Sequence, residues 1–446
     1  MNELIRDPRD VIQNSPMSRP QVHAVALTGA LSALDGFDLL SITFVAPVLA
    51  KDFDVGSGAL GLLLSSGLLG TLIGSFILAP FADIIGRRPI VLISLAIMAL
   101  GMLVSALCHS IFELAIVRVF TGIGIGAMVV VINPIAVEFS NRRMRSFAIS
   151  MMSIGYPIGG MVGGPVAAFL LRYYDWRAVF LFGGAIGLLL APFVIWRLPE
   201  SLSFLLERRS ESSLMRVNAL LARFGHRPLA GLPPAPIKHR TPYAEIFRST
   251  QLRITAQVSA ISFLTFLTIY FFLSWQPKIL VDLGFGVSTA ASIAGASSFA
   301  GACGCAIFGV LSRRFDGRTL AVASILGLGV SVIAFGSVPS SVTALIIIVA
   351  MLAGSCVAAA TIGLFVTAAD AFEPHVRATG TGFIVGIGRL ASALSPSLAG
   401  GLFALGSGRA SVCAAIGACA VIAGVMLIKL SPYAPSYPAK TEAATS

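Results

Sequence analysis

Two carboxylates three residues apart, Asp35 and Asp38, lie in an apolar run that extends from about Val22 to Leu49. That run is long enough to cross a bilayer, which takes about 20 apolar residues in a helix. An acid at the centre of such a span costs roughly 2.5–3.5 kcal/mol on insertion scales, so two acids there indicate a function. Residues three apart share a helix face, and Gly36 between them lets a ligand or another backbone approach. Two nearby acids in a medium of low dielectric cannot both ionise cheaply and should titrate as a coupled pair, which suits proton-coupled transport. A soluble amphipathic helix with two solvated acids is the weaker alternative.

Two arginines lie inside other apolar runs, where each needs an anionic partner. Asp38 or Asp35 is the expected partner of Arg118, unless Arg118 extends to water at the outer edge of its span. Arg389 lies near the middle of its run, where a guanidinium could bind a substrate carboxylate through two hydrogen bonds. A structural ion pair is the alternative for Arg389.

Aromatic and amide side chains supply candidate contacts for a substrate ring. Tyr270, Trp275 and Gln276 lie near the outer end of the seventh run, and Tyr156 lies in a run rich in glycine and proline. Trp275 could instead belong to the belt of aromatic residues at the membrane interface.

These residues sit on elements that the composition assigns to a membrane protein. The chain has 446 residues, of which 56% are hydrophobic and 11% charged, and its mean hydropathy is +0.90. Soluble domains carry about 25% charged residues. Twelve apolar runs are found, at about 22–49, 58–82, 89–108, 112–138, 146–171, 178–198, 252–281, 288–312, 319–338, 342–371, 378–405 and 410–431.

The runs predict an all-α polytopic membrane protein with 12 transmembrane helices in two six-helix bundles. We expect the following division of the chain: an N-terminal tail (1–21), a first bundle (22–198), a linker (199–250), a second bundle (251–431) and a C-terminal tail (432–446). The first 20 residues are polar, without the apolar stretch of a signal peptide, and indicate a mobile cytoplasmic tail. Within the linker, residues 202–224 could form a basic amphipathic helix on the anionic inner leaflet.

The basic residues fix the orientation and exclude a nucleic-acid partner, although the net charge is +11. They cluster between apolar runs, with 24 Lys and Arg on the tails and on one set of loops and 5 on the opposite loops. Because cytoplasmic loops carry the excess of Lys and Arg, both termini are predicted to be cytoplasmic. The six cysteines lie in or beside apolar runs without metal-type spacing and are interpreted as packing residues.

Charged residues at the inner ends of the runs could lock neighbouring helix ends in one conformation and release them in another. The loop after the second run reads Asp83-Ile84-Ile85-Gly86-Arg87-Arg88, in which the glycine permits a tight turn. Glu200 could pair with a basic loop end or be solvated. The predicted charge network consists of Asp83, Gly86, Arg87, Arg88, Glu138, Arg142, Glu200, Glu373 and Arg377.

Five motifs together resemble those of the aromatic acid:proton symporter family of the major facilitator superfamily: Asp35-Gly36-Phe37-Asp38, the loop 83–88, Pro199-Glu200-Ser201, Ser274-Trp275-x-Pro277 and Arg377-Ala378-Thr379-Gly380. The loop departs from the family pattern, because Ile84 replaces an arginine and Ala79 a glycine. The resemblance implies import of a benzoate-like or hydroxybenzoate-like acid with protons across the bacterial inner membrane. It implies no cofactor beyond the proton motive force, small-molecule and lipid partners, and a monomer.

Three alternatives stay open at the level of sequence. The glycine- and proline-rich run at 155–165 also suits an exporter of drugs or metabolites, and relatives of the family carry muconate or nicotinate. A membrane enzyme or receptor is disfavoured, since no HExxH motif, histidine cluster or phosphate-binding loop is found. Thr265 and Thr268 take the places of the two acids in the second half, so proton chemistry is expected in the first half.

Overall fold

The computed structural model describes residues 7–208, 211–233, 243–373 and 375–430, and over these residues the regular structure is helical. Twelve of the described helices are long and apolar enough to cross a membrane, which confirms the predicted architecture. Apolar runs of this length fold as helices because lipid offers no partners for backbone amide and carbonyl groups. Observed and predicted ends of the spans differ by at most three residues when α3, η1 and α4 are taken as one span.

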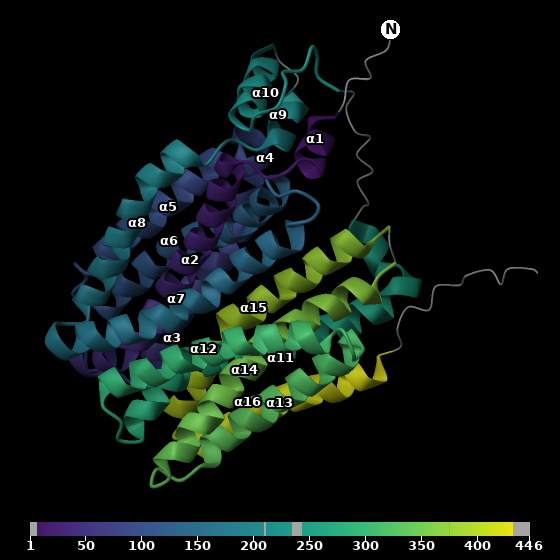
Figure 1. Cartoon of the computed structure of the whole chain (residues 1–446). Coiled ribbons are helices and arrows are strands. Elements are labelled where there is room, and N and C mark those ends of the chain that lie inside the picture. The colour runs from purple at the N-terminus through teal and green to yellow at the C-terminus, as the bar shows by residue number, and fades with distance from the viewer. Residues whose placement is uncertain (1–6, 209–210, 234–242, 374, 431–446) are drawn as a thin grey trace, which may run out of the picture.

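The two halves each contribute six spanning helices (Figure 1). The first half contains α2 (Arg19–Asp52), α3 (Ser57–Ile77), η1 (Ala79–Phe81), α4 (Ala82–Ile85), α5 (Arg87–Ser105), α6 (Ile111–Glu138), α7 (Arg145–Tyr173) and α8 (Arg177–Arg197). The second half contains α11 (Ser249–Asp282), α12 (Val287–Leu311), α13 (Gly317–Ser337), α14 (Thr343–Ala371), α15 (Arg377–Ala404) and α16 (Arg409–Lys429).

The halves touch mainly through α3 with α15 and α7 with α12. The contacts lie toward the ends that the predicted orientation places outside. There the Ser65 and Ser397 hydroxyl oxygens are 2.7 Å apart, and the Ser288 hydroxyl donates to the Ala168 carbonyl oxygen at 2.9 Å. Toward the opposite ends a large cavity separates the halves. On that orientation, the structure is closed outside and open to the cytoplasm.

The segment before the first span is partly ordered against the first half. Helix α1 (Pro8–Asn14) is capped by the Asp7 side chain, which accepts a hydrogen bond from the Arg9 amide. Ile12 is buried, and the Gln13 carbonyl oxygen accepts from the Arg142 amide at 2.9 Å. The prediction of a mobile tail is therefore wrong over residues 8–14, because Pro8 and Ile12 are buried and anchor the helix. Residues 1–6 lie outside the described part.

The linker also packs on the first half. It contains α9 (Leu202–Arg208), α10 (Glu211–Arg223) and η2 (Tyr243–Phe247). Leu205, Val217 and Leu221 are buried in one cluster with side chains of the first half, and the Phe224 ring lies 5.7 Å from that of Phe139. The prediction that residues 202–224 lie with their apolar face in the leaflet is therefore wrong. That face covers instead the ends of the spanning helices of the first half that the predicted orientation places in the cytoplasm (Figure 1).

Candidate functional site

A buried ion pair joins α2 to α6 in the interior of the first half. The Arg118 Nη1 atom lies 2.7 Å from the Asp38 Oδ1 atom, and Nη2 donates to the Asp38 carbonyl oxygen at 2.8 Å. Both residues are 1% exposed. The alternative in which Arg118 extends to water is therefore wrong, and the expected contact with Asp38 is present. Each charge is stabilised by the other, since removing one partner of a buried ion pair leaves the other charge uncompensated and costs about 3–5 kcal/mol of stability.

Asp35 is buried to the same degree but has a different environment. It is 1% exposed, and neither carboxylate oxygen has a hydrogen-bond partner among the described residues. The second carboxylate oxygen of Asp38 has no such partner either. Gly36 lies where α2 crosses α7, and a Cβ atom there would come within 2.2 Å of the Tyr156 carbonyl oxygen. The backbone approach expected at Gly36 is thus present, and the acid beside it is enclosed.

A cavity of about 1660 Å³ lies between the halves, lined by helices of both. This exceeds the 300–1,000 Å³ of typical ligand pockets because the cavity is open at one end. Of the predicted site residues, Tyr156, Tyr270, Arg389, Arg87 and Glu138 line it. Asp35 and Asp38 do not line it in this conformation, so both acids lie behind its wall.

Arg389 extends from α15 to the adjacent helix α3 of the other half, at the wall of the cavity. Its Nη1 atom donates to the Ser75 hydroxyl and, at 3.4 Å, to the Thr71 carbonyl oxygen. No acid among the described residues forms an ion pair with it. The structural ion pair considered for Arg389 is therefore not found, and its positive charge is held by neutral groups in the wall of the cavity.

Two tyrosines on opposite halves lie between the cavity and the buried ion pair. Tyr156 and Tyr270 line the large cavity and also a second space of about 10 Å³ whose wall includes Arg118. A space of about 10–15 Å³ is the size of one water molecule. The Tyr156 hydroxyl is buried without a partner among the described residues, and the Tyr270 ring stacks on Phe266 at 6.2 Å. The tyrosines therefore offer polar and ring contacts at the layer that separates cavity from acids.

A charge network joins the start of α5, the end of α6 and the start of α9. Arg87 forms a 2.9 Å ion pair with Glu138. The Glu138 carboxylate also accepts from the Ser201 hydroxyl at 2.8 Å and from the Ser203 amide at 2.5 Å. The contacts hold the start of the linker against the first half.

Glu200 caps the N-terminus of α5. Its Oε1 atom accepts from the backbone amides of Arg87 at 2.9 Å and Arg88 at 3.1 Å, so it contacts backbone rather than a basic side chain. Gly86 precedes them with a φ of 111°, and a Cβ atom there would lie 2.5 Å from the Glu200 Oε2 atom. The turn therefore requires glycine for both conformation and space. Asp83 is exposed and makes no ion pair among the described residues in this conformation.

Comparisons with known proteins agree with this architecture. A family model described as Major Facilitator Superfamily matches residues 27–335 and 258–446. The chain belongs to the Major Facilitator Superfamily. It is therefore a transporter rather than an enzyme. Among solved structures, the xylose transporter XylE from E. coli in a partially occluded inward-open conformation matches with a TM-score of 0.74 at 15% identity, over 93% of this chain and 99% of that one.

Relatives of this transporter carry names of aromatic acid transporters, which confirms the resemblance seen in the motifs. A gallate transporter of Pseudomonas putida is 32% identical over 407 residues, 90% of each chain. A 4-hydroxybenzoate transporter of Pseudomonas aeruginosa is 29% identical over 408 residues, again 90% of each chain. A 3-(3-hydroxy-phenyl)propionate transporter of Escherichia coli is 28% identical over 415 residues, 91% of this chain and 93% of the relative.

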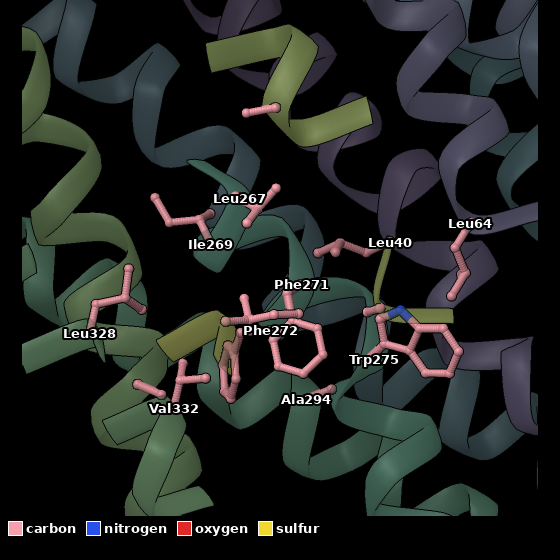
Figure 2. Close-up of a cluster of buried hydrophobic side chains, with 14 of the residues drawn as sticks. Leu40, Leu64, Leu267, Ile269, Phe271, Phe272, Trp275, Ala294, Leu328 and Val332 are labelled. Atoms are coloured by element: carbon pink, nitrogen blue, oxygen red, sulfur yellow. The ribbon is translucent and has the colours of Figure 1, made fainter. Parts of the chain in front are cut away.

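Two of the predicted substrate contacts of the transporter lie away from the cavity. Trp275 is buried with Leu40 and Leu64 of the other half (Figure 2), and its indole N–H donates to the Pro396 carbonyl oxygen at 3.1 Å. It belongs neither to an interfacial belt nor to the cavity wall, so both interpretations are wrong for this conformation. Gln276 is also buried and donates to the Ser297 hydroxyl at 2.7 Å, one layer behind the wall.

The other predicted charged residues of the network are dispersed. Arg142 lies past the end of α6, so the spacing of four from Glu138 does not bring them together, and its nearest acid is Asp10 at 3.8 Å. Glu373 likewise lies past the end of α14, and its carboxylate accepts a hydrogen bond from the side-chain amide of Gln251 at 2.7 Å. Arg377 is exposed and forms no ion pair with the described acids. Among the described residues, Arg142 and Glu373 therefore contact groups outside the Arg87–Glu138 network in this conformation.

Several polar residues of the site had no signal in the sequence. Ser75 and Thr71 hold Arg389, and Ser65 and Ser397 join the halves near the outside. Serine and threonine are common inside transmembrane helices, and neither their spacing nor their charge separates these residues from others. The one available hint was Arg389 itself, since a charge inside a span needs polar partners.

Proposed function

We propose that the transporter imports a small aromatic carboxylate together with at least one proton across the bacterial inner membrane by alternating access. The observation that carries this proposal is Arg389, whose guanidinium lines the cavity with only neutral partners among the described residues. A carboxylate substrate supplies the missing negative charge. The names of the relatives support gallate and hydroxybenzoates as the substrate class.

Substrate recognition would combine this charge with the surrounding rings. An Arg–carboxylate pair can form two parallel hydrogen bonds and is stronger than a bond between neutral groups. Tyr156, Tyr270 and Phe266 line the same cavity from both halves and can contact the substrate ring or its hydroxyl groups. Trp275 and Gln276 act indirectly, by shaping α11 and positioning Ser297.

Proton coupling would use the enclosed acids. An ionised Asp35 leaves a charge buried without a counter-ion, a state that costs several kcal/mol, whereas protonation removes the charge. Asp38 shares its charge with Arg118. The small space between Arg118 and the tyrosines suggests the path by which a proton or a water reaches the pair. The proton motive force is then the driving force, and no cofactor takes part.

The cytoplasmic charges would set which end of the cavity is open. In this conformation the Arg87–Glu138 pair and the Glu200 cap hold the first half together, while Asp83 is free to pair when the cytoplasmic ends close. We place both termini in the cytoplasm, on the distribution of Lys and Arg. A single chain encloses the whole path, which is consistent with a monomer.

The decisive experiment measures uptake by purified protein in liposomes with an imposed pH gradient, acidic outside. We expect accumulation of labelled gallate or 4-hydroxybenzoate that a protonophore abolishes. Accumulation of muconate or nicotinate in place of hydroxybenzoates would change the substrate class but keep the mechanism. Flux of dyes against the gradient without uptake of any aromatic acid would identify an exporter and refute the proposal.

A further inference from the structure

Three arginines gather around the end of α8, on the lipid-facing side of the first half. Arg88 donates to the Ile195 carbonyl oxygen at 2.5 Å. Arg223 of α10 donates to the next two carbonyl oxygens, those of Trp196 at 3.1 Å and Arg197 at 3.0 Å. The guanidiniums are thus held at consecutive carbonyl oxygens of one helix end, and Arg223 reaches that end from α10, which lies beyond the ends of the spanning helices (Figure 1).

The third arginine extends the cluster toward the start of α2. The Arg197 Nη1 atom lies 3.1 Å from the His23 ring nitrogen Nδ1. Among the described residues no acid forms an ion pair with Arg88, Arg197 or Arg223. The Arg88 Nε atom is buried and has no hydrogen-bond partner there.

The positive charge of the cluster exceeds what the helix ends can balance. The C-terminus of α8 supplies about half a negative charge. Glu200 is adjacent, but its carboxylate is committed to the backbone amides of α5, whose N-terminus carries about half a positive charge. Burial lowers the pKa of the Arg223 guanidinium, and the nearby charges of Arg197 and Arg88 lower it further. At least one net positive charge therefore remains without a counter-ion.

The surroundings of the cluster point to a lipid rather than a soluble anion. Trp196 is 73% exposed and Phe193 57% exposed, both on the last turn or two of α8. An exposed tryptophan at the end of a transmembrane helix lies at the level of lipid headgroups. Basic pockets at this level bind anionic headgroups.

We propose that Arg88, Arg197 and Arg223 bind the phosphate of an anionic phospholipid, whose acyl chain lies along Trp196 and Phe193. The lipid ties α10 of the linker to the ends of α5 and α8. It supplies the negative charge that the protein lacks at this junction, and it does so outside the transport cavity.

The position of the tryptophans provides a direct assay. The chain has three tryptophans, and Trp176 and Trp275 are 1% exposed. Brominated acyl chains quench a tryptophan on contact, so quenching of the full-length protein in neutral detergent reports Trp196. We expect brominated phosphatidylglycerol to quench at lower concentration than brominated phosphatidylcholine, and Trp196→Phe to remove the difference.

Substitutions then separate charge from helix capping. The double variant Arg197→Gln/Arg223→Gln should raise the phosphatidylglycerol concentration for half-quenching about 25-fold, at about fivefold for each basic residue removed near a membrane surface. Arg223→Lys keeps the charge and should keep the preference for phosphatidylglycerol. Arg313→Gln/Arg314→Gln, which removes the same two charges from an exposed turn of the other half, is the matched control and should have no effect.

Three results would overturn the proposal. The first is equal quenching by the two lipids in the unaltered protein. The second is an undiminished preference for phosphatidylglycerol in the double variant. The circular dichroism spectrum must show that this variant is folded. The third is displacement of phosphatidylglycerol by an equal concentration of inorganic phosphate at an ionic strength matched with chloride, because the site would then bind a soluble anion.

Discussion

Neutralising the two acids of α2 should affect stability in opposite ways, although they are equally buried. Asp35 and Asp38 are each 1% exposed and lie three residues apart on one helix. Asp38 carries the ion pair to Arg118, whereas the Asp35 carboxylate has no hydrogen-bond partner among the described residues. We therefore compare Asp35→Asn with Asp38→Asn, which make the same chemical change.

The magnitude follows from what each substitution leaves behind. Asp38→Asn leaves the Arg118 charge buried with only neutral partners, and breaking a buried pair from one side costs about 3–5 kcal/mol. At about 2–4 °C per kcal/mol for folding units of 150–250 residues, the unfolding midpoint should fall by at least about 6 °C. Asp35→Asn removes an uncompensated acid and should leave the midpoint unchanged or raise it.

The assay is thermal unfolding in neutral detergent, combined with two transport measurements in liposomes. Both variants should lose accumulation driven by a pH gradient, because each removes an acid of the coupled pair. Both should retain exchange of labelled for unlabelled substrate, because that process needs no net proton movement. Arg118→Gln added to Asp38→Asn should restore part of the lost stability, since the buried charge is then gone.

Two outcomes would refute the reasoning. Equal loss of stability in Asp35→Asn and Asp38→Asn would mean that the ion pair does not distinguish the two acids. Accumulation at the full rate in either variant would remove that acid from proton coupling. The second outcome bears on function alone and leaves the structural argument about Arg118 in place.

Three further sets of substitutions test the binding site, the turn at Gly86 and the contact between Ser65 and Ser397. Arg389→Lys keeps the charge but cannot form two parallel hydrogen bonds to a carboxylate. Loss of one charged hydrogen bond of about 1.5–3 kcal/mol should raise the substrate concentration for half-maximal uptake about 10–150-fold. An unchanged concentration would exclude the bidentate role. Gly86→Ala meets a φ of 111° and the Glu200 carboxylate, and should lower the unfolding free energy by about 1–3 kcal/mol in a denaturation experiment. An unchanged denaturation midpoint in Gly86→Ala would contradict this, because it would mean that the turn can rearrange to accept the added methyl group. The pair Ser65→Cys/Ser397→Cys should form a disulfide on oxidation and block uptake until reduced, as the hydroxyls are 2.7 Å apart; uptake that continues in the oxidised protein would refute closure there.

The sequence alone predicted the transmembrane spans and the buried partner of Arg118, for related reasons. Lipid excludes both unsatisfied backbone and unpaired charge, so apolar runs must be helices and a charge within a run must find an opposite charge. Few charges lie within spans, which left Asp38 or Asp35 as the partner of Arg118. The choice between the two acids needed the structure, because both share one helix face.

Three predictions were wrong or incomplete because they depend on how a helix is rotated about its axis or on the residue at which it ends. The residues next to each position in the sequence do not determine either property. Trp275 lies near a predicted membrane interface, but the rotation of α11 turns it toward the core and the Pro396 carbonyl oxygen. Glu138 and Arg142, both expected in the charge network, do not pair with each other, because α6 ends at Glu138 and the spacing of a helix does not continue to Arg142. The ordered α1 was missed because a short helix with few apolar residues, Val11 and Ile12 among them, has no clear pattern in a mostly polar segment.

The two arginines within spans show how binding could be linked to movement. Arg118 has its acid within its own half, so turning one half against the other does not by itself separate the pair. Arg389 has neutral partners instead, and they belong to α3 of the other half. A substrate carboxylate is a stronger acceptor for a guanidinium than a hydroxyl or a backbone carbonyl. Its arrival should therefore withdraw Arg389 from Ser75 and weaken a contact between the halves. On this argument, Ser75→Ala should increase substrate exchange without changing the proton dependence of uptake, and a loss of exchange would contradict it.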